Sequence, residues 1–307
     1  MLDWVREDGL MDPGTAVVAM FSGGRDSVCL LDLLVRLLGA EAVTALHVNY
    51  GLRDDSDSDE AHCARLCERL GCRLEIERPR RPEGPGNLQG WARDTRYSAA
   101  AQLALPQQAL IATGHTADDQ VETILYRLAS SPSRRALLGM RRQDGSLVRP
   151  LLGFTRAETT AYCEERELRW RDDPSNAGDG YARNRVRNQL VPALTGIHPA
   201  AASNVLRTAE LLRDEAAVLD ALVDAELGGA NGSARGTIEL QRLAELPGAL
   251  RRLVVQRLAD RAAGRPVPGA ANHADEVAAL RRTGTAMLDL GGGTRAVVER
   301  GVLRAER

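Results

Sequence analysis

The sequence predicts an α/β fold: a doubly wound, mainly parallel sheet, with a helical extension and a small C-terminal α+β domain. Three observations lead to this prediction. Short apolar segments alternate with segments of helical length up to about residue 130. A glycine-rich turn joins the first apolar segment directly to the first helix. Beyond a second glycine-rich stretch, Gly228–Gly236, helices give way to short strands near the end of the chain.

Each expected strand of the sheet is short, and each is followed by a helix; the third strand alternates between apolar and polar residues. The strands are Thr15–Phe21, Ala42–Val48, Cys72–Glu77 and Gln108–Thr113. The helices are Val28–Leu38, Ser58–Leu70, Leu88–Leu103 and Ala117–Leu128. Repeated strand–helix units imply parallel strands with right-handed crossovers. In such sheets ligands bind at the carboxyl ends of the strands, so that edge is where functional residues are expected.

The second part of the chain is more helical and then changes character. A long amphipathic helix is expected at Ala200–Leu227. The segments that follow are helices near Pro247–Ala263 and Ala274–Arg282, and strands at Ala286–Leu290, Arg295–Glu299 and Val302–Ala305. We therefore expect a main domain at residues 1–228, which includes the connecting helix, and a small domain at residues 229–307.

The composition excludes several classes of protein. All 40 basic residues are arginine, since the chain has no lysine. A Walker A loop, a protein kinase and a pyridoxal enzyme each need a lysine, so none of them is present. The net charge of −2 means that any contact with nucleic acid must come from a local patch. Aromatic residues are only 3%, which argues against recognition of nucleic acid mainly by base stacking.

Cysteine usage and hydropathy bear on the compartment. The five cysteines include no CxxC pair, so neither a disulfide framework nor a zinc ribbon is indicated. The first residues, Met1–Gly14, lack the apolar core of a signal peptide. No apolar run approaches the ~20 residues that a membrane span requires. We expect a cytoplasmic protein without a membrane partner.

The turn after the first strand reads SGGRDS, residues Ser22–Ser27. Paired glycines let the backbone adopt positive φ and turn its N–H groups toward an oxyanion, and the start of the next helix adds its dipole. Ser22 and Ser27 can donate hydroxyl hydrogen bonds, and Asp26 can approach a phosphate-bound Mg²⁺. The segment therefore predicts a phosphate-binding loop, with an ordinary strand-to-helix turn as the alternative. The predicted loop residues are Ser22, Gly23, Gly24, Arg25, Asp26 and Ser27.

Two further strand ends carry polar residues. His47–Arg53 (HVNYGLR) follows the second strand, where the nucleoside half of a nucleotide would lie, although the segment alone also reads as a turn. The fourth strand ends in TGHTADDQVETIL, which enters a helix. Its polar residues predict a compact acidic group suited to Mg²⁺ and to a substrate with an ammonium group, rather than mere complements of the helix dipole. That group is His115, Asp118, Asp119 and Glu122.

The segment from Arg127 to Arg187 has 13 arginines against 8 acidic residues. Arginine-rich patches suit phosphate backbones, although a charge run is more often a solvated face. The densest clusters are Arg134 with Arg135, Arg141 with Arg142, and Arg183 and Arg185 with Arg187.

These motifs together resemble a known family. SGGRDS resembles the pyrophosphate-binding loop of the N-type ATP pyrophosphatases, the PP-loop proteins, whose Rossmann-like domain cleaves ATP between its α and β phosphates. The full set occurs in the order seen in tRNA(Ile)-lysidine synthetases and covers about residues 15 to 195. Its segments are Ser22–Ser27, His47–Arg53, Trp91–Tyr97, Thr113–Thr123, Leu137–Met140, Arg149–Leu152 and Arg169–Leu194.

The resemblance implies a ligase that attaches L-lysine to carbon 2 of the wobble cytidine of tRNA(Ile), through an adenylated tRNA. ATP is its substrate and Mg²⁺ its metal, and a homodimer is left open. Besides the loop, the implied ATP contacts are His47, Asn49, Arg93 and His115. The implied catalytic residues are Asp26, Asp118 and Asp119, with Mg²⁺ on Asp26 and Asp119. The implied lysine or tRNA contacts are Glu122, Arg183, Arg185 and Arg187.

Two positions depart from the family pattern. Thr116 stands where the family commonly has a second histidine, and Ser130–Ser133 (SSPS) stands where it usually has an Arg-Gly-Ser-Gly run. Three alternatives to a lysidine synthetase are left open. One is another PP-loop enzyme that modifies tRNA, such as a tRNA thiolase. The others are a ligase that acts on a small acceptor, like the NAD synthetases, and a nucleotide-binding protein without catalysis. The family's thiolases generally use paired cysteines, and this sequence has no CxxC pair.

Overall fold

The computed structural model divides the chain into two units, Met1–Glu210 and Leu211–Arg307. It describes all residues except 53–54, 81, 83–86, 132–133, 172–181 and 229–235. The stretch predicted to link two domains falls mostly on 229–235 and therefore lies outside the described residues. Each unit is considered by itself below.

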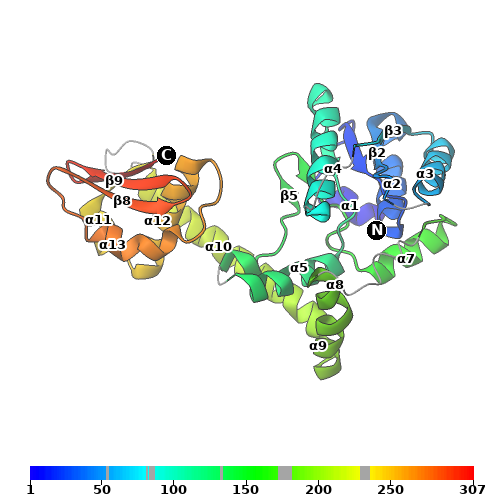
Figure 1. Ribbon diagram of the computed structural model, residues 1–307. Helices are drawn as coiled ribbons and strands as arrows, with labels where there is room; N and C mark the ends of the chain where they lie inside the picture. The colour runs from blue at the N-terminus through cyan, green and yellow to red at the C-terminus, as the bar shows by residue number, and fades with distance from the viewer. Residues whose placement is uncertain (53–54, 81, 83–86, 132–133, 172–181, 229–235) are drawn as a thin grey trace. The chain divides into compact units, whose positions relative to one another are not determined.

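The first unit is built on a six-stranded sheet in the order β3-β2-β1-β4-β6-β5. Figure 1 labels β2, β3 and β5 of this sheet. All neighbouring strands are parallel except β5 and β6, which form an antiparallel hairpin at one edge. This confirms the predicted, mainly parallel sheet. The strands are β1 (Val17–Met20), β2 (Val43–Val48), β3 (Arg73–Glu77), β4 (Leu110–Ala112), β5 (Gln143–Asp144) and β6 (Leu147–Val148).

Helices cover both faces of this sheet, as a doubly wound fold requires. On one face, α2 (Arg25–Leu38) buries Leu30 and Leu34 completely against β1 and β2, in a core that it shares with α3 (Ser56–Leu70). On the other face, α4 (Leu88–Ala104) packs Ala100 and Ala104 against the opposite sides of β1, β2 and β4, in a separate core. Short 3₁₀ turns, η1 (Ala40–Ala42) and η2 (Leu105–Gln107), lead into β2 and β4.

The helical extension follows β4. Its α7 packs against α2, and there the buried Asp32 of α2 accepts a 2.7 Å hydrogen bond from the Tyr162 hydroxyl. Val121 and Leu125 of α5 pack against Val186 in a π-helical turn. The elements are α5 (Ala117–Ser130), α6 (Arg134–Leu137), α7 (Arg156–Glu165), α8 (Ala182–Arg185), the π-helical turn η4 (Val186–Leu190), α9 (Val191–Ile197) and the start of α10 (Ala201–Leu227), in addition to α1 (Leu2–Glu7) at the N-terminus.

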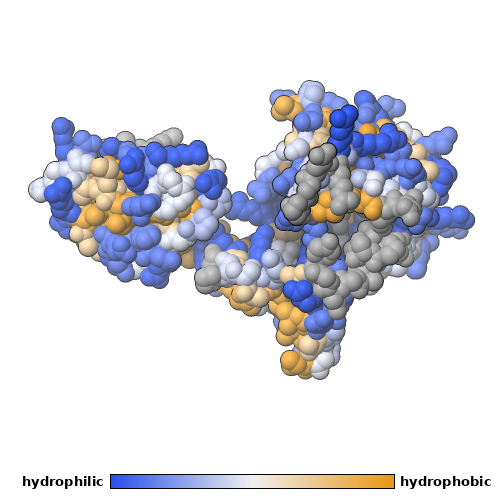
Figure 2. All heavy atoms as spheres, viewed as in Figure 1, coloured by the Kyte–Doolittle hydropathy of each residue, from blue (hydrophilic) through white to orange (hydrophobic). Residues whose placement is uncertain are grey.

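Most of the visible surface of the first unit is hydrophilic, and apolar side chains gather over α9 (Figure 2). Leu190 and Ile197 are the exposed apolar residues of this helical segment, and Ile197 retains 81% of its accessible surface. Contiguous exposed apolar surface of this kind is typical of interaction sites.

The second unit has its own apolar core around the end of α10, where Val223 and Leu227 are buried. Its antiparallel sheet has the order β7-β10-β9-β8. This confirms the expected small α+β domain. The elements are β7 (Ile238–Glu239), α11 (Leu240–Glu245), α12 (Gly248–Ala263), the 3₁₀ turn η5 (Ala270–His273), α13 (Ala274–Ala278), β8 (Thr285–Gly291), β9 (Thr294–Glu299) and β10 (Val302–Glu306). No helix among the described residues of either unit is long and apolar enough to span a membrane.

Candidate active site

The predicted phosphate loop lies between β1 and α2, at the carboxyl end of the sheet. Hydroxyl groups hold its shape. The Ser27 hydroxyl donates to the Gly24 carbonyl at 2.8 Å and accepts from the Ser22 backbone N–H at 3.3 Å. Gly24 is the N-cap of α2, so the first backbone N–H groups of this helix, which have no acceptor within the helix, lie at the loop. The loop therefore presents backbone donors and a helix dipole, which is the arrangement that binds a phosphate.

Two glycines let other segments pack tightly against this loop. Gly23 has a φ of +81°, and a Cβ there would lie 3.0 Å from the Cys63 sulfur of α3. Gly114, which follows β4, has no side chain to keep it from the loop: a Cβ there would lie 3.0 Å from the Asp26 carbonyl oxygen. Gly114 was not among the predicted site residues, and this close approach explains why a glycine stands there.

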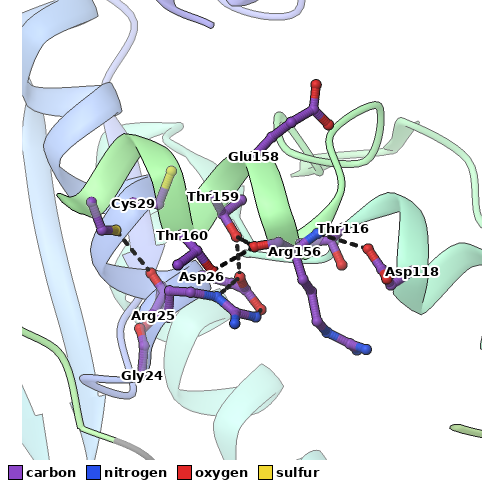
Figure 3. Close-up of polar contacts among 12 residues, drawn as sticks. Gly24, Arg25, Asp26, Cys29, Thr116, Asp118, Arg156, Glu158, Thr159 and Thr160 are labelled. Atoms are coloured by element: carbon purple, nitrogen blue, oxygen red, sulfur yellow. Dashed lines mark hydrogen bonds and ion pairs between the residues drawn. The ribbon is translucent and has the colours of Figure 1, made fainter. Parts of the chain in front are cut away.

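Asp26 lies at the start of α2 and is held by two neighbours (Figure 3). The Thr159 hydroxyl of α7 donates to Asp26 Oδ1 at 2.6 Å, and Arg25 donates to both carboxylate oxygens at 3.0 and 3.2 Å. Its side chain keeps 22% of its accessible surface. Thr159 was not predicted, because it is 133 residues away in the chain and its segment carries no motif.

The residues predicted for the nucleoside half, His47 and Asn49, are buried at the end of β2. His47 Nδ1 donates to the Phe21 carbonyl at 3.0 Å, directly before the phosphate loop. The Asn49 amide donates to Asp57 and Glu60 of α3, each at 3.0 Å. In this arrangement the two side chains brace the loop after β2 against its neighbours.

The two adjacent aspartates of α5 have different surroundings. Asp118 Oδ2 accepts the backbone N–H of Arg156, at the start of α7, at 2.7 Å (Figure 3). Asp119 Oδ2 forms a capping box with Thr116, whose hydroxyl in turn accepts the Asp119 N–H. Thr116 is fully buried. The threonine that replaces the family's second histidine is thus the N-cap of this helix.

Three arginines converge on the remaining oxygens of Asp119 and Glu122. Arg156 of α7 donates to Asp119 at 2.7 Å and to Glu122 at 2.8 Å. Arg183 donates to both carboxylates, at 3.2 and 3.1 Å. Arg187 donates to Glu122 at 2.7 Å from the π-helical turn, an element that often occurs at functional sites. We call Asp119, Glu122, Arg156, Arg183 and Arg187 the charged centre.

The charged centre contains more than the sequence predicted. Arg156 was missed, although it has more contacts with the predicted acidic group than any predicted arginine: its backbone binds Asp118 and its guanidinium binds Asp119 and Glu122. Arg183 and Arg187, predicted as contacts to tRNA, are here ion-paired within the protein. Arg185 lies in α8, and its predicted role is untested by this geometry.

Burial and charge set the protonation of this region. Burial raises the pKa of Asp119, but Arg156 and Arg183 outweigh it and hold that pKa below its usual value. Burial, together with the charges of Arg149, Arg183 and Arg96, lowers the pKa of His115 to about 4, against the opposing effect of Asp119. His115 Nδ1 lies 2.8 Å from the Thr113 hydroxyl. His115 is therefore a neutral imidazole at neutral pH.

We expect the stability of the first unit to fall by about 2 kcal/mol between pH 7 and pH 5 because of His115. In the unfolded chain this histidine takes up a proton near pH 6.5, whereas in the folded chain it does so only near pH 4. The unfolded state therefore binds more protons in this window, and acid favours it. His115→Asn should remove this pH dependence. The measurement is urea denaturation followed by tryptophan fluorescence, since all three tryptophans (Trp4, Trp91 and Trp170) lie in the first unit. An equal pH dependence in both proteins would contradict the assignment.

Two motif segments cannot be placed. The DDPSN motif falls on residues 172–181, and Pro132 and Ser133 of the SSPS segment are also outside the described residues. The chain leading to the first of these segments does reach the site. The Arg171 N–H donates to the Gly23 carbonyl at 2.9 Å, and its side chain pairs with Asp59 at 3.0 Å.

A glycine-rich loop after the first strand of a parallel sheet, with an acidic group after the neighbouring strand, defines a nucleotide-binding α/β domain. The chain belongs to the PP-loop domain family, whose model matches residues 6–194. The Rossmann-like PP-loop fold predicted from SGGRDS is thereby confirmed.

Relatives agree with the finer resemblance. The chain is 40% identical over 214 residues to a tRNA(Ile)-lysidine synthase of Pseudomonas fluorescens, covering 67% of this chain and 48% of that protein. It is 35% identical over 255 residues to a tRNA(Ile)-lysidine synthase of Methylococcus capsulatus, covering 80% and 58%. The resemblance to lysidine synthetases is therefore confirmed. The chain spans about half the length of these curated relatives.

Among solved structures, the chain is similar to a U34-tRNA thiolase, NcsA from Methanococcus maripaludis with its [4Fe-4S] cluster. The TM-score is 0.57 and the identity 18%, over 69% of this chain and 77% of that one. At this identity the similarity is one of fold.

Proposed function

We propose that the protein ligates L-lysine to carbon 2 of the wobble cytidine of tRNA(Ile). ATP first adenylates the 2-oxygen of the cytidine and releases pyrophosphate, and the ε-amine of lysine then displaces AMP to give lysidine. The observation that carries the proposal is the packing of the phosphate loop against Gly114, which leads directly into α5 and the charged centre. Adenylation and lysine addition share the adenylated cytidine, so the protein groups that act in the two steps must lie close to one another. The relatives named above support the choice of tRNA and lysine.

For the adenylation step, the loop from Ser22 to Ser27 holds the phosphates of ATP. Its N–H groups and the start of α2 stabilise the negative charge that grows on the leaving pyrophosphate. Mg²⁺ is commonly held by one or two carboxylates plus substrate phosphates, and the partly exposed Asp26 beside the loop fits that role. Asp119 is less exposed than Asp26 (13% against 22% of its side-chain surface) and is held by two arginines, so Asp26 fits the metal better. When bound, the metal would neutralise phosphate charge.

For the lysine step, the charged centre offers both signs of charge. Free lysine brings an ammonium group and a carboxylate, so carboxylates and guanidinium groups together complement it. The ion pairs of Arg183 and Arg187 with Glu122 mean that an incoming ammonium competes with arginine for the same oxygens. The second unit, and with it residues 229–307, we assign to tRNA recognition without chemistry.

The alternatives differ in what they require. The thiolase alternative rests on a likeness of fold. A small-acceptor ligase would not need the family segments shared with the lysidine synthases. A non-catalytic nucleotide-binding protein would bind ATP without cleaving it.

One assay separates all of these functions. Pyrophosphate release should require both lysine and a tRNA with a wobble cytidine. Release that needs tRNA and sulfur donor but not lysine would indicate a thiolase. Release with a small acceptor alone would indicate the other ligase, and ATP binding without release would indicate a binding protein.

We expect Asp118→Asn and Asp119→Asn to fail at different steps. Asp119 lies in the charged centre, so its loss should leave AMP transfer to tRNA but slow lysine addition about a hundredfold. Asp118 instead braces the start of α7, the helix that also supplies Thr159 to Asp26, so its loss should slow adenylation. The measurement is trapping of labelled adenylyl-tRNA, without and then with lysine. A block at the same step in both variants would reject this division of roles.

A further inference from the structure

A second group of arginines lies in the first unit outside the charged centre. Arg93 and Arg96 are on α4, and Arg149 follows β6. Unlike Arg156, Arg183 and Arg187, none of the three forms an ion pair with a residue that the structure describes. Three guanidinium groups in one region, none of them paired with a described carboxylate, predict an anion from outside the protein. We call Arg93, Arg96, Tyr97 and Arg149 the arginine cluster. The sequence resemblance implied a contact to ATP for Arg93, whereas the structure places it on α4 over the Tyr97 ring.

The topology places the arginine cluster at the functional edge of the sheet. β6 runs parallel to β4, so Arg149 and His115 both follow the carboxyl ends of neighbouring strands. The first turns of α4 reach the same edge, because the Tyr50 hydroxyl beyond β2 donates to the Ala92 carbonyl at 2.7 Å. After burial, the charges of Arg149 and Arg96 contribute to the lowered pKa of His115.

Two arginines of the cluster lie over its tyrosine ring, and the third is held by the backbone. Arg93 lies over the Tyr97 ring at 4.7 Å from its centroid, and Arg96 lies at 5.9 Å from it. Arg149 is only 7% exposed and anchors one nitrogen on the Arg141 carbonyl at 2.5 Å. Stacking and this anchor hold the guanidinium planes before any ligand arrives, which reduces the entropy that binding costs.

Buried donors in the cluster lack partners. Arg149 Nε, Arg96 Nε and the Tyr97 hydroxyl are all buried, and none has a hydrogen-bond partner among the described residues. An unsatisfied buried donor destabilises the folded state, so three of them in one cluster need an explanation. Asp144 acts on Arg149 through its charge but forms no ion pair with it in the described structure.

We infer that the arginine cluster is a phosphate subsite, separate from the phosphate loop, that binds a phosphodiester next to the wobble cytidine of the RNA. This inference rests on the proposed function and specifies how that site holds its RNA. Arginine forks match the two non-bridging oxygens of a phosphodiester. The loop follows β1, whereas Arg149 follows β6, two strands or about 10 Å away. If the wobble cytidine lies between the phosphate loop and the charged centre, the RNA phosphodiesters next to it are within reach of the arginine cluster.

The test is a double-mutant cycle with an anticodon stem-loop that carries a wobble cytidine. The protein variants are Arg149→Gln and, in case that buried change disturbs folding, Arg96→Gln. The RNA variants carry an uncharged methylphosphonate at one or the other phosphodiester flanking the cytidine. The control is Arg73→Gln, since Arg73 begins β3 at the opposite edge of the sheet and is exposed. Binding of RNA and of ATP is measured for each.

We expect each cluster variant to weaken RNA binding about tenfold and to lower the salt slope by about one. One methylphosphonate should weaken wild-type binding equally and have no further effect on the variant. Additive losses at both linkages would overturn the inference, and so would lost ATP affinity with intact RNA affinity. If the losses are additive but the wild-type protein binds the stem-loop and releases pyrophosphate with tRNA and lysine, the subsite alone is rejected. Wild-type protein that does neither would reject the proposed function as well.

Discussion

Asp26→Ala is expected to lower turnover by about a hundredfold to a thousandfold and to leave tRNA affinity within about twofold. Asp26 is partly exposed beside the phosphate loop, where it fits Mg²⁺ on the phosphates of ATP. Its partners are Arg25 and Thr159, and neither belongs to the charged centre or to the arginine cluster. The change therefore removes a group that acts on ATP and none that faces RNA. The measurements are pyrophosphate release at saturating tRNA and lysine, and tRNA binding by filter retention.

Two further variants sharpen this prediction. Thr159→Val removes the 2.6 Å hydrogen bond to Asp26 but keeps the carboxylate, so turnover should fall by about tenfold. Asp12→Ala removes an exposed carboxylate from the segment before β1 and should change neither quantity. Loss of tRNA affinity in parallel with turnover for Asp26→Ala would mean that the loop also holds RNA, and that the division between ATP and RNA groups is wrong.

The parts of the site that the sequence predicted are those whose role is local. Ser22–Ser27 works through its own glycines, hydroxyls and helix start, and all of these are neighbours in the chain. The other long strands and helices are also local patterns, and the prediction located those it named to within a few residues, but it named no helix at α7 (Arg156–Glu165). β5 and β6 were missed because two residues each are too few to show a pattern, and only pairing with β4 makes them strands.

The missed residues act across the fold. Arg156 reaches Asp119 and Glu122, which precede it by 37 and 34 residues, and Thr159 reaches Asp26 over 133. Nothing near Arg156 in the sequence identifies those targets. A charge run likewise does not reveal its partners, which is why Arg183 and Arg187 were interpreted only as contacts for RNA, although in this structure they neutralise Glu122.

We expect Gly114→Ala to lower turnover by about a hundredfold with a modest loss of stability, about 1–3 kcal/mol. The new Cβ would lie 3.0 Å from the carbonyl oxygen and 3.1 Å from the carbonyl carbon of Asp26, and 3.3 Å from the Ser27 nitrogen. These are backbone atoms, so no side chain can rotate away to make room. The phosphate loop must shift, and a misplacement of about 1 Å at reacting groups can cost a hundredfold in rate.

The site of this clash decides what the change should affect. Gly114 separates the loop that holds ATP from α5, which carries Asp119 and Glu122, so a shift there should weaken ATP binding and slow adenylation while the charged centre stays folded. Gly196→Ala is the matched control, because a Cβ in that helix would meet no atom within 4 Å. ATP affinity, measured by calorimetry, and formation of adenylyl-tRNA report on the loop, and the urea midpoint reports on stability. Normal turnover in Gly114→Ala would show that the loop tolerates displacement, and the contact between the two segments would then have no part in positioning ATP.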